Sequence, residues 1–190
     1  MALLPFAAVV PTPRYRGRDP KVSSGFRTSD RPGHDGSDLM FKRLPFDPGP
    51  PQGAVPYTSR GHFHPEGLTA LAFGPGVVTT SEVITTGGYV IISHPGGWTS
   101  QYMHLARRDV KVGDKVTTGQ PIGIIGFDTR PGGYKLIHLH FQLRKDGVLV
   151  DPGPILRALP IVDAPGGAMT WLLAAGAAVV LGVWASRFIR

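Results

Sequence analysis

The chain has 190 residues, and none of them is cysteine. This absence excludes a disulfide framework and any metal site built from thiolates. A metal bound here would need histidine nitrogens and carboxylate oxygens as its ligands, and the chain contains seven histidines. The histidines and the acidic residues near them are therefore the first candidates for a functional site.

Clusters of basic residues are also missing, although the net charge of the chain is +7. Such a charge favours polyanionic neighbours, including nucleic acid, anionic lipid and cell-wall polymers. The arginines and lysines are spread along the sequence, with no basic helix and no alternation of basic with aromatic residues. We therefore expect no specific nucleic-acid partner.

A cleaved signal peptide is not predicted, because the apolar residues 1–10 lack a basic region before them and a cleavage site after them. We expect residues 1–20 to form an extended arm. The 26 glycines and 19 prolines favour turns and short strands over long helices. The length suits one well-buried domain, and we predict a mainly β domain over residues 21–159, with an antiparallel, β-sandwich-like sheet.

Several segments indicate how that sheet is built. Three apolar and β-branched runs predict successive strands: residues 68–78, 89–93 and 99–105. His94, ahead of a Pro-Gly-Gly sequence, is expected in a turn. Residues 110–123 alternate around two glycines and predict a strand, a turn and a second strand, and Asp146-Gly147 predicts a hairpin.

The strongest chemical signal is His138-Leu139-His140-Phe141, inside an apolar run. Side chains alternate between the faces of a strand, so the two histidines share one face, roughly 7 Å apart along the backbone. Leu139 and Phe141 then point into the core. One imidazole can ligate a metal while the other handles a proton or holds a water, so this stretch predicts a functional site.

A weaker candidate is the pair His34 and Asp38, which have Gly33 and Gly36 beside them. Glycine lets the backbone turn tightly, so both side chains can converge on one point. The spacing alone is more typical of a turn or a helix cap. It gains weight from the histidine pair about a hundred residues later. A lone histidine such as His104 is, by itself, more often a packed or solvated residue.

A competitor for the metal lies in the Pro- and Gly-rich segment 44–65, which we interpret as a loop insertion. It contains His62-Phe63-His64, a second pair of histidines two residues apart. Its neighbours provide no strand-like apolar frame. We therefore favour a solvated or groove-lining role for His62 and His64 over metal ligation.

The end of the chain differs from the rest. Residues 164–186 contain no charged residue and no polar face, which predicts a transmembrane helix, and Trp171 and Trp184 lie near its ends. A short basic tail, residues 187–190, follows. The bias of arginine towards the cytoplasm would place the domain on the opposite side of the bilayer, at the cell wall, or in a virion membrane if the protein is viral.

Taken together, the motifs resemble those of the lysostaphin-type (LytM-like) zinc metallopeptidases, which cut peptide bonds in bacterial peptidoglycan. The resemblance covers about residues 22–156. It is carried by six motifs in order: S-G-F at 24–26, H-x-G-x-D at 34–38, Y-x-H-L at 102–105, V-G-D-x-V-x-x-G-Q at 112–120, H-L-H-F at 138–141 and V-D-P at 150–152. Each motif alone is common, but the ordered set is specific.

The resemblance implies that His34, Asp38 and His140 hold Zn²⁺ and leave a fourth position for water. It implies that His138 acts as general base and that His104 stabilises or positions the tetrahedral intermediate. The sequence does not decide which imidazole dominates proton transfer. Backbone carbonyls or Asp35 would orient the ligand imidazoles. The implied function is that of a membrane-anchored endopeptidase that cuts peptide cross-links or stem peptides of peptidoglycan.

Two other functions compete with this one. A non-catalytic structural or regulatory membrane protein, such as a virion component or an activator of a wall hydrolase, would keep the fold and lose site residues. All five expected site residues are present. One departure from the family pattern is Ser37, which stands between Gly36 and Asp38 where the family usually has an aliphatic residue. A biotin- or lipoyl-carrier domain has a hairpin similar to residues 112–120, but Lys111 and Lys115 lie outside the frame such carriers use.

Overall fold

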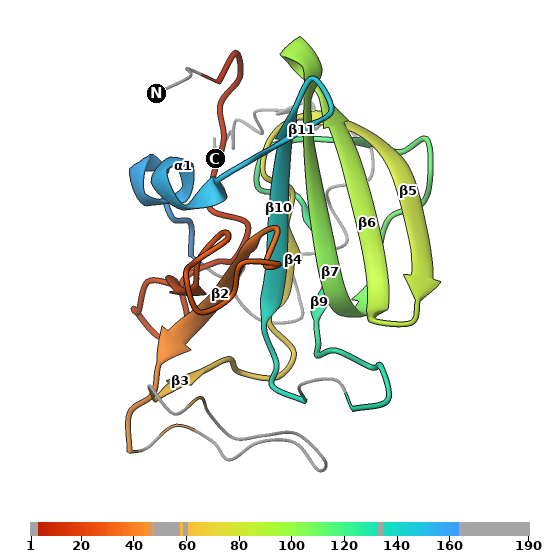
Figure 1. Ribbon diagram of the computed structural model, residues 1–190. Helices are drawn as coiled ribbons and strands as arrows, with labels where there is room; N and C mark the ends of the chain where they lie inside the picture. The colour runs from red at the N-terminus through yellow and green to blue at the C-terminus, as the bar shows by residue number, and fades with distance from the viewer. Residues whose placement is uncertain (1–3, 46, 48–57, 59–60, 133–134, 164–190) are drawn as a thin grey trace, which may run out of the picture.

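The computed structural model describes residues 4–45, 47, 58, 61–132 and 135–163. These residues form one antiparallel sheet with a short helix at its side (Figure 1). The hydrogen-bonded order is β1-β2-β10-β7-β6-β5-β8, while β3 pairs with β2, β11 with β10, and β9 with both β4 and β7. The expected antiparallel, mainly β architecture is therefore confirmed.

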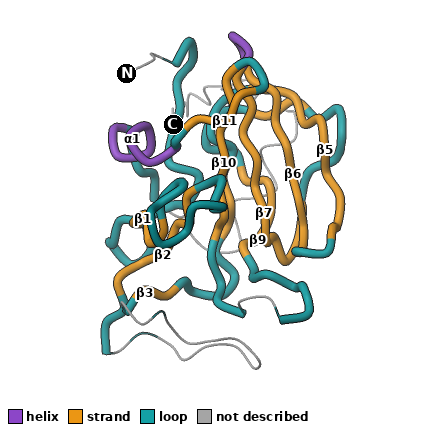
Figure 2. The backbone as a smooth tube through the Cα atoms, in the orientation of Figure 1, coloured by secondary structure: helices purple, strands orange, loops and turns teal. Residues whose placement is uncertain are grey.

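The elements have the following bounds. The first strands are β1 (Lys21–Ser24), β2 (Ser37–Lys42), β3 (His62–Phe63), β4 (Thr69–Leu71), β5 (Gly76–Ile84) and β6 (Gly87–His94). They are followed by β7 (Trp98–Arg108), β8 (Lys115–Val116), β9 (Pro121–Ile125), β10 (Leu139–Lys145) and β11 (Val148–Val150). Helical structure is confined to a 3₁₀ turn, Pro95–Gly97, and to α1, Pro152–Ala158, within the described chain (Figure 2).

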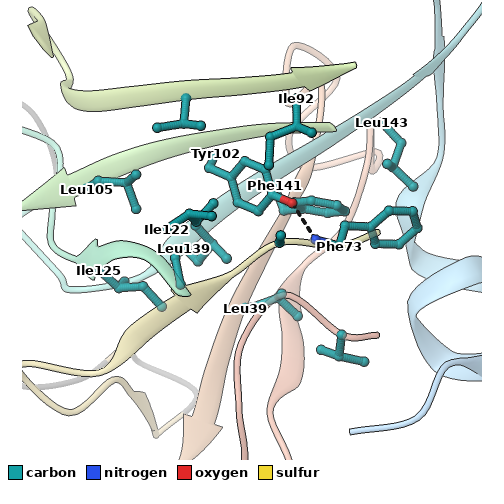
Figure 3. Close-up of a cluster of buried hydrophobic side chains, with 14 of the residues drawn as sticks. Leu39, Phe73, Ile92, Tyr102, Leu105, Ile122, Ile125, Leu139, Phe141 and Leu143 are labelled. Atoms are coloured by element: carbon teal, nitrogen blue, oxygen red, sulfur yellow. Dashed lines mark hydrogen bonds between the residues drawn. The ribbon is translucent and has the colours of Figure 1, made fainter. Parts of the chain in front are cut away.

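The core lies between the long strands and the pair β4 and β9, which crosses behind them (Figure 1). Tyr102 on β7 and Phe141 on β10 are fully buried, and their rings meet edge to face at 5.4 Å (Figure 3). Phe73, just after β4, packs on Phe141 at 5.5 Å. Because Phe141 and Leu139 both face this core, the histidine between them must face the opposite side of the sheet.

The hairpin at Asp146-Gly147 is confirmed. Lys145 pairs with Val148, and the two turn residues have φ angles of +49° and +79°. Two consecutive positive φ values define the tight turn that matches the twist of antiparallel strands, and Gly147 adopts such a value without steric strain.

Two expectations for the strands are wrong. Residues 110–123 do not form a self-paired unit, because β8 pairs with β5 while β9 pairs with β4 and β7. His94 is not a turn residue but the buried last residue of β6, where its ring bonds to the Pro75 carbonyl and to Ser100. Both outcomes depend on partners distant in the sequence.

The segment around His62 also has more structure than expected. His62–Phe63 forms β3, which pairs with Phe41 and Lys42 of β2. Phe63 is buried against Phe41, and with Leu68 these residues form a second, small apolar cluster. This cluster stabilises β3, although the residues next to His62 in the sequence do not show a strand-like apolar pattern.

The two ends of the described chain lie together. Arg14 pairs in a parallel bridge with Asp163, and the Val10 amide donates to the Pro160 carbonyl at 3.1 Å. Residues 4–12 of the expected arm pack on the domain, with Val10 and Thr12 buried. No helix in the described residues is long and apolar enough to span a membrane, and the predicted span 164–186 lies outside them.

Candidate metal centre

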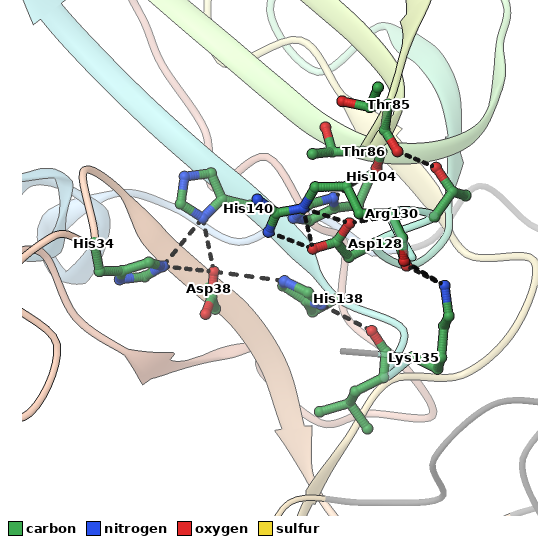
Figure 4. A network of polar contacts seen from close by, with 12 residues as sticks. His34, Asp38, Thr85, Thr86, His104, Asp128, Arg130, Lys135, His138 and His140 are labelled. Carbon is green, nitrogen blue, oxygen red and sulfur yellow. Dashed lines mark hydrogen bonds and ion pairs between the residues drawn. The ribbon is translucent and has the colours of Figure 1, made fainter. Parts of the chain in front are cut away.

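The register of the sheet brings two candidate ligands face to face. Asp38 on β2 lies directly opposite His140 on β10, and His140 Nδ1 is 2.9 Å from Asp38 Oδ1. His34 precedes β2, and its Nε2 lies 3.0 Å from the same oxygen and 3.1 Å from His140 Nδ1 (Figure 4). One ligand atom from each of the three residues lies within 4.8 Å of the others.

Gly36 makes this close approach possible. A Cβ atom at position 36 would lie 2.6 Å from the Phe141 carbonyl oxygen and 2.7 Å from His140 Nε2. Both distances are shorter than real Cβ contacts, so a larger residue would push β10 and the imidazole away. The glycine between His34 and Asp38 is therefore required by its packing against Phe141 and His140.

The hydrogen bonds around His34 orient it towards the other two side chains. Its Nδ1–H donates to the Gly25 carbonyl at 2.6 Å, so the neutral ring carries its lone pair on Nε2. That lone pair faces a carboxylate oxygen and a second imidazole nitrogen. A carbonyl thus orients this ligand, as expected, whereas Asp35 does not, because it pairs with Arg27 at 2.8 Å.

The charges of the cluster favour a bound cation. Burial alone would raise the pKa of the Asp38 carboxyl, but the ring nitrogens of His140 and His34 at hydrogen-bond distance, together with the nearby His138, hold it well below its ordinary value. Burial alone would also lower the pKa of His34, yet the hydrogen bond and charge of Asp38 raise it overall. Two nitrogens and an ionised oxygen converge at hydrogen-bond distance, and this donor set fits a metal ion such as zinc.

Arg31 completes the surroundings of Asp38, and no sequence signal identified it. Its Nη1 donates to Asp38 Oδ2 at 2.9 Å and to Ser24 Oγ at 2.7 Å. The second carboxylate oxygen is thereby occupied, which leaves Oδ1 to face the two histidines. Gln142, two residues after His140 on the same face, contacts His140 Nε2 at 3.1 Å, and strand alternation could have identified it.

His138 and His104 lie beside this cluster with their rings 4.7 Å apart (Figure 4). Each donates Nδ1–H to a backbone carbonyl at 2.8 Å: His138 to Leu136 and His104 to Thr86. Each therefore presents its Nε2 lone pair away from that carbonyl, and His138 Nε2 lies 3.7 Å from Asp38 Oδ1. All five residues singled out from the sequence thus meet in one place.

Both of these imidazoles are held in the neutral form. Burial is the largest cause that lowers the pKa of His138, and it outweighs the attraction of Asp38. Burial, together with the repulsion that a protonated His138 would exert, lowers the pKa of His104 to about 4. At neutral pH each ring can therefore accept a proton on Nε2.

The backbone links the two rings. Gly126 donates its N–H to the His104 carbonyl at 2.7 Å and accepts the His138 N–H at 3.0 Å. His104 itself has a φ of +65°, an unusual value for a residue with a side chain, at the point where β7 leaves β10 and pairs with β9. Local irregularities of this kind redirect side chains and are frequent beside active sites.

His62 and His64 are not part of the metal cluster. The group that could hold a metal comprises His34, Asp38 and His140 among the described residues. His64 is buried against Phe41 and donates Nδ1–H to the Pro65 carbonyl at 2.8 Å. Burial lowers its pKa to about 4. His64 is therefore a neutral core residue, neither solvated nor lining the groove.

The five side chains line a groove of about 810 Å³. Its other polar lining residues include Arg31, Thr86, Asp128 and Arg130. A groove of this size accommodates a segment of peptide or another elongated ligand.

Similarity to known proteins agrees with this geometry. Residues 62–152 match the model of peptidase family M23, a range that includes His104, His138 and His140 but not His34 or Asp38. The peptidoglycan DD-endopeptidase ShyC of Vibrio cholerae is 38% identical over 89 residues, which cover 46% of this chain and 20% of that protein. The stage II sporulation protein Q of Bacillus subtilis is 36% identical over 81 residues, which cover 40% of this chain and 27% of that protein.

Solved structures share the fold. A zinc-containing peptidase from Vibrio cholerae superposes with a TM-score of 0.54 at 24% identity, covering 78% of this chain and 40% of that one. A structure of the SpoIIQ–SpoIIIAH pore-forming complex superposes with a TM-score of 0.55 at 22% identity, covering 85% of this chain and 94% of that one. The chain spans only about a fifth to a quarter of the length of ShyC and of the sporulation protein. The ordered motifs, the sheet and these matches show that residues 62–152 belong to a domain of peptidase family M23, the lysostaphin-type family.

Proposed function

We propose that this protein is a zinc metalloendopeptidase that hydrolyses peptide bonds of bacterial peptidoglycan. The observation that carries the proposal is the convergence of His34 Nε2, Asp38 Oδ1 and His140 Nδ1 beside two neutral imidazoles. Similarity to the DD-endopeptidase ShyC supports peptidoglycan as the substrate.

Zinc bound by His34, Asp38 and His140 would polarise the scissile carbonyl and lower the pKa of water towards 7. The protein's own groups then have to move protons and hold the peptide. Arg31 and the Gly25 carbonyl fix the orientation of Asp38 and His34, so the ligand atoms need little rearrangement.

We assign the general base to His138. Its Nδ1–H is anchored on Leu136, and its Nε2 faces the metal ligands, at 3.7 Å from Asp38 Oδ1. A neutral ring in this position can take a proton and pass it to the leaving amine. His104, anchored on Thr86, accepts a substrate N–H at rest, and it donates to an oxyanion only after it gains a proton.

The non-catalytic alternative predicts decay of the site. All five side chains are present and oriented towards one another, so the geometry supports the enzyme over the structural protein.

The enzyme proposal is tested with the purified full-length chain and its His140→Ala variant. Zinc content is measured by mass spectrometry of the metal, and fragments released from defined muropeptides are identified by mass. We expect about one zinc per native chain and fragment release that the variant lacks. Equal release by both proteins would remove the peptidase assignment.

We also propose that residues 164–186 anchor the domain in a membrane, with the domain on the cell-wall side. The uncharged sequence, its terminal tryptophans and the arginines at 187 and 190 support this. Membrane tethering would concentrate the enzyme near its substrate. In fractionated cells the full chain should sediment with membranes, whereas a chain ending at residue 163 should not. Equal distribution of the two would contradict the anchor.

A further inference from the structure

Two arginines line the groove beside the metal centre, each supported by a buried carboxylate. The side chains of Arg31 and Arg130 are 50% and 57% exposed, while those of their partners Asp38 and Asp128 are 8% and 6% exposed. All four residues line the groove. The guanidinium groups are therefore accessible from the groove, whereas the carboxylates that hold them are buried in its wall.

Arg130 is held firmly by Asp128. Its Nη2 donates to Asp128 Oδ2 at 2.6 Å, and its Nε lies 3.0 and 3.1 Å from the two carboxylate oxygens. The backbone N–H of Arg130 also donates to Asp128 Oδ1 at 3.0 Å. Because three donors of one residue share a single carboxylate, the guanidinium has little rotational freedom left to lose when a ligand binds.

The loop that carries Arg130 is hydrogen-bonded to the loop that carries Thr86, whose carbonyl accepts the His104 N–H. Thr129 Oγ1 donates to the Thr85 carbonyl at 2.9 Å, next to the Thr86 carbonyl that holds His104. Lys135 Nζ donates to the carbonyls of Asp128 and Arg130 at 3.0 and 3.1 Å. Figure 4 shows Arg130 on the His104 side of the site, away from His34. Its position relative to His104 is therefore fixed by hydrogen bonds.

Both guanidinium groups keep unused donors. Among the described residues, Arg130 Nη1 and Arg31 Nη2 have no hydrogen-bond acceptor. Asp35, the remaining acidic residue of the groove lining, is already paired with Arg27. A planar guanidinium with free N–H groups binds carboxylates in preference to neutral carbonyls, since the hydrogen bonds are assisted by charge.

We propose that Arg130 is a specificity-determining residue that binds a carboxylate of the substrate, with Arg31, which is held by Asp38, adding to the preference. The preferred substrate is then an anionic peptide with a carboxylate close to the scissile bond, rather than a neutral glycine-rich bridge. This inference rests on the proposed peptidase function and names the substrate class for it.

The test uses the zinc-loaded full-length chain and four synthetic stem peptides. The side-chain carboxylate and the C-terminal carboxylate are each either free or converted to an amide, so the two sources of the carboxylate are separated. Binding is measured by calorimetry and hydrolysis by kcat/KM. We expect one of the free carboxylates to improve binding and kcat/KM by about tenfold or more over its amide.

Arg130→Gln should remove this preference, because it should lower the affinity and the kcat/KM for the free acid to those for the amide. Arg130→Lys, which keeps the charge, should retain part of it. The matched control is Arg107→Gln. Arg107 also pairs with an aspartate two residues away, Asp109, but it does not line the groove, so its loss should leave the ratio unchanged.

Loss of Arg130 leaves Asp128 buried without its partner, so Arg130→Gln combined with Asp128→Asn is measured as well. The ratio of acid to amide is taken within each variant and is therefore independent of a general loss of activity. Equal binding of acid and amide by the native chain would overturn the inference, and so would an unchanged ratio in both Arg130→Gln and the double variant. A preference in binding without hydrolysis would support it and count against the peptidase function alone.

Discussion

The protein buries two groups of polar side chains, one on strands β6 and β7 and the other between β2 and β10, and they differ in how their hydrogen bonds are satisfied. In the first, which we term the distal network, His94 contacts the Pro75 carbonyl and Ser100 Oγ, the Ser100 and Tyr102 hydroxyls share a hydrogen bond, and Tyr102 accepts the Phe73 N–H. The protein supplies every partner. In the metal centre, ligand atoms of His34, Asp38 and His140 face one another.

A structural histidine differs from a functional one in its partners and not in its burial. His94 and His140 are both buried, at 5% and 8% exposed. The ring lone pair of His94 points at the Ser100 hydroxyl, whereas the ligand atoms of His34, Asp38 and His140 point at one another. A network with all partners present rigidifies the core, whereas converging acceptors need a cation. Four experiments test this distinction.

The largest effect is expected from His140→Ala, which removes one ligand. A metal contributes several kcal/mol of transition-state stabilisation, so kcat/KM should fall by about a thousandfold or more. Zinc should be lost from the variant, and zinc should no longer raise its melting temperature. His94→Asn, a change in the distal network, should keep full zinc content. A His140→Ala protein that still binds zinc stoichiometrically would show that the ligand set is wrong.

Acid should destabilise the metal-free protein through histidines that are buried in the neutral form. Burial lowers the pKa of His64 from 6.5 to about 4 and also lowers that of His94. The unfolded chain then binds more protons, so stability is full above about pH 6.5 and falls as the pH drops towards 4, by roughly 3 kcal/mol for His64. His34, whose pKa is raised, acts with the opposite sign: its contribution is present below pH 6.5 and is lost as the pH rises through its folded pKa.

Urea denaturation at pH 7 and pH 5 measures this change. His64→Met should reduce the change in the free energy of unfolding between pH 7 and pH 5, because it removes the buried group that must acquire a proton on unfolding. An unchanged slope in that variant would mean that His64 is protonated in the fold.

Tyr102→Phe tests the distal network. The change deletes the hydroxyl that accepts the Phe73 N–H at 2.7 Å and shares a hydrogen bond with Ser100 Oγ at 3.1 Å. A buried amide left without a partner should lower the free energy of unfolding by about 1–3 kcal/mol. Zinc content and the KM for muropeptides should not change. A loss of zinc would show that the two groups are coupled through β7.

The smallest effect is expected from a pair of serines that are both fully buried. Ser37 Oγ has no hydrogen-bond partner, whereas Ser100 Oγ bonds to His94 and Tyr102. Ser37→Ala should raise the free energy of unfolding by up to about 1 kcal/mol, and Ser100→Ala should lower it by about the same amount or more. Thermal denaturation of the two variants side by side measures the difference, and shifts of the same sign would contradict the distinction between satisfied and unsatisfied groups.

The chemical inventory and much of the local geometry could be predicted from the order of residues alone. The absence of cysteine restricted ligands to histidine and carboxylate, and alternation in a strand put His138 and His140 on one side, opposite Leu139 and Phe141. The Asp146-Gly147 turn was equally predictable, because positive φ values have a strong residue preference. These features depend on neighbours within a few residues.

Other features depend on distant partners and emerged only in the folded chain. The register of β2 on β10 sets Asp38 against His140, and pairing of β3 with β2 gives order to a segment that looks irregular in sequence. Burial of His94 and His64 follows from packing by Phe73, Phe41 and other distant residues. Arg31 and Arg130 became recognisable only from the carboxylates that hold them at the groove. Local propensity carries no information about such contacts, because they form only when remote strands pair.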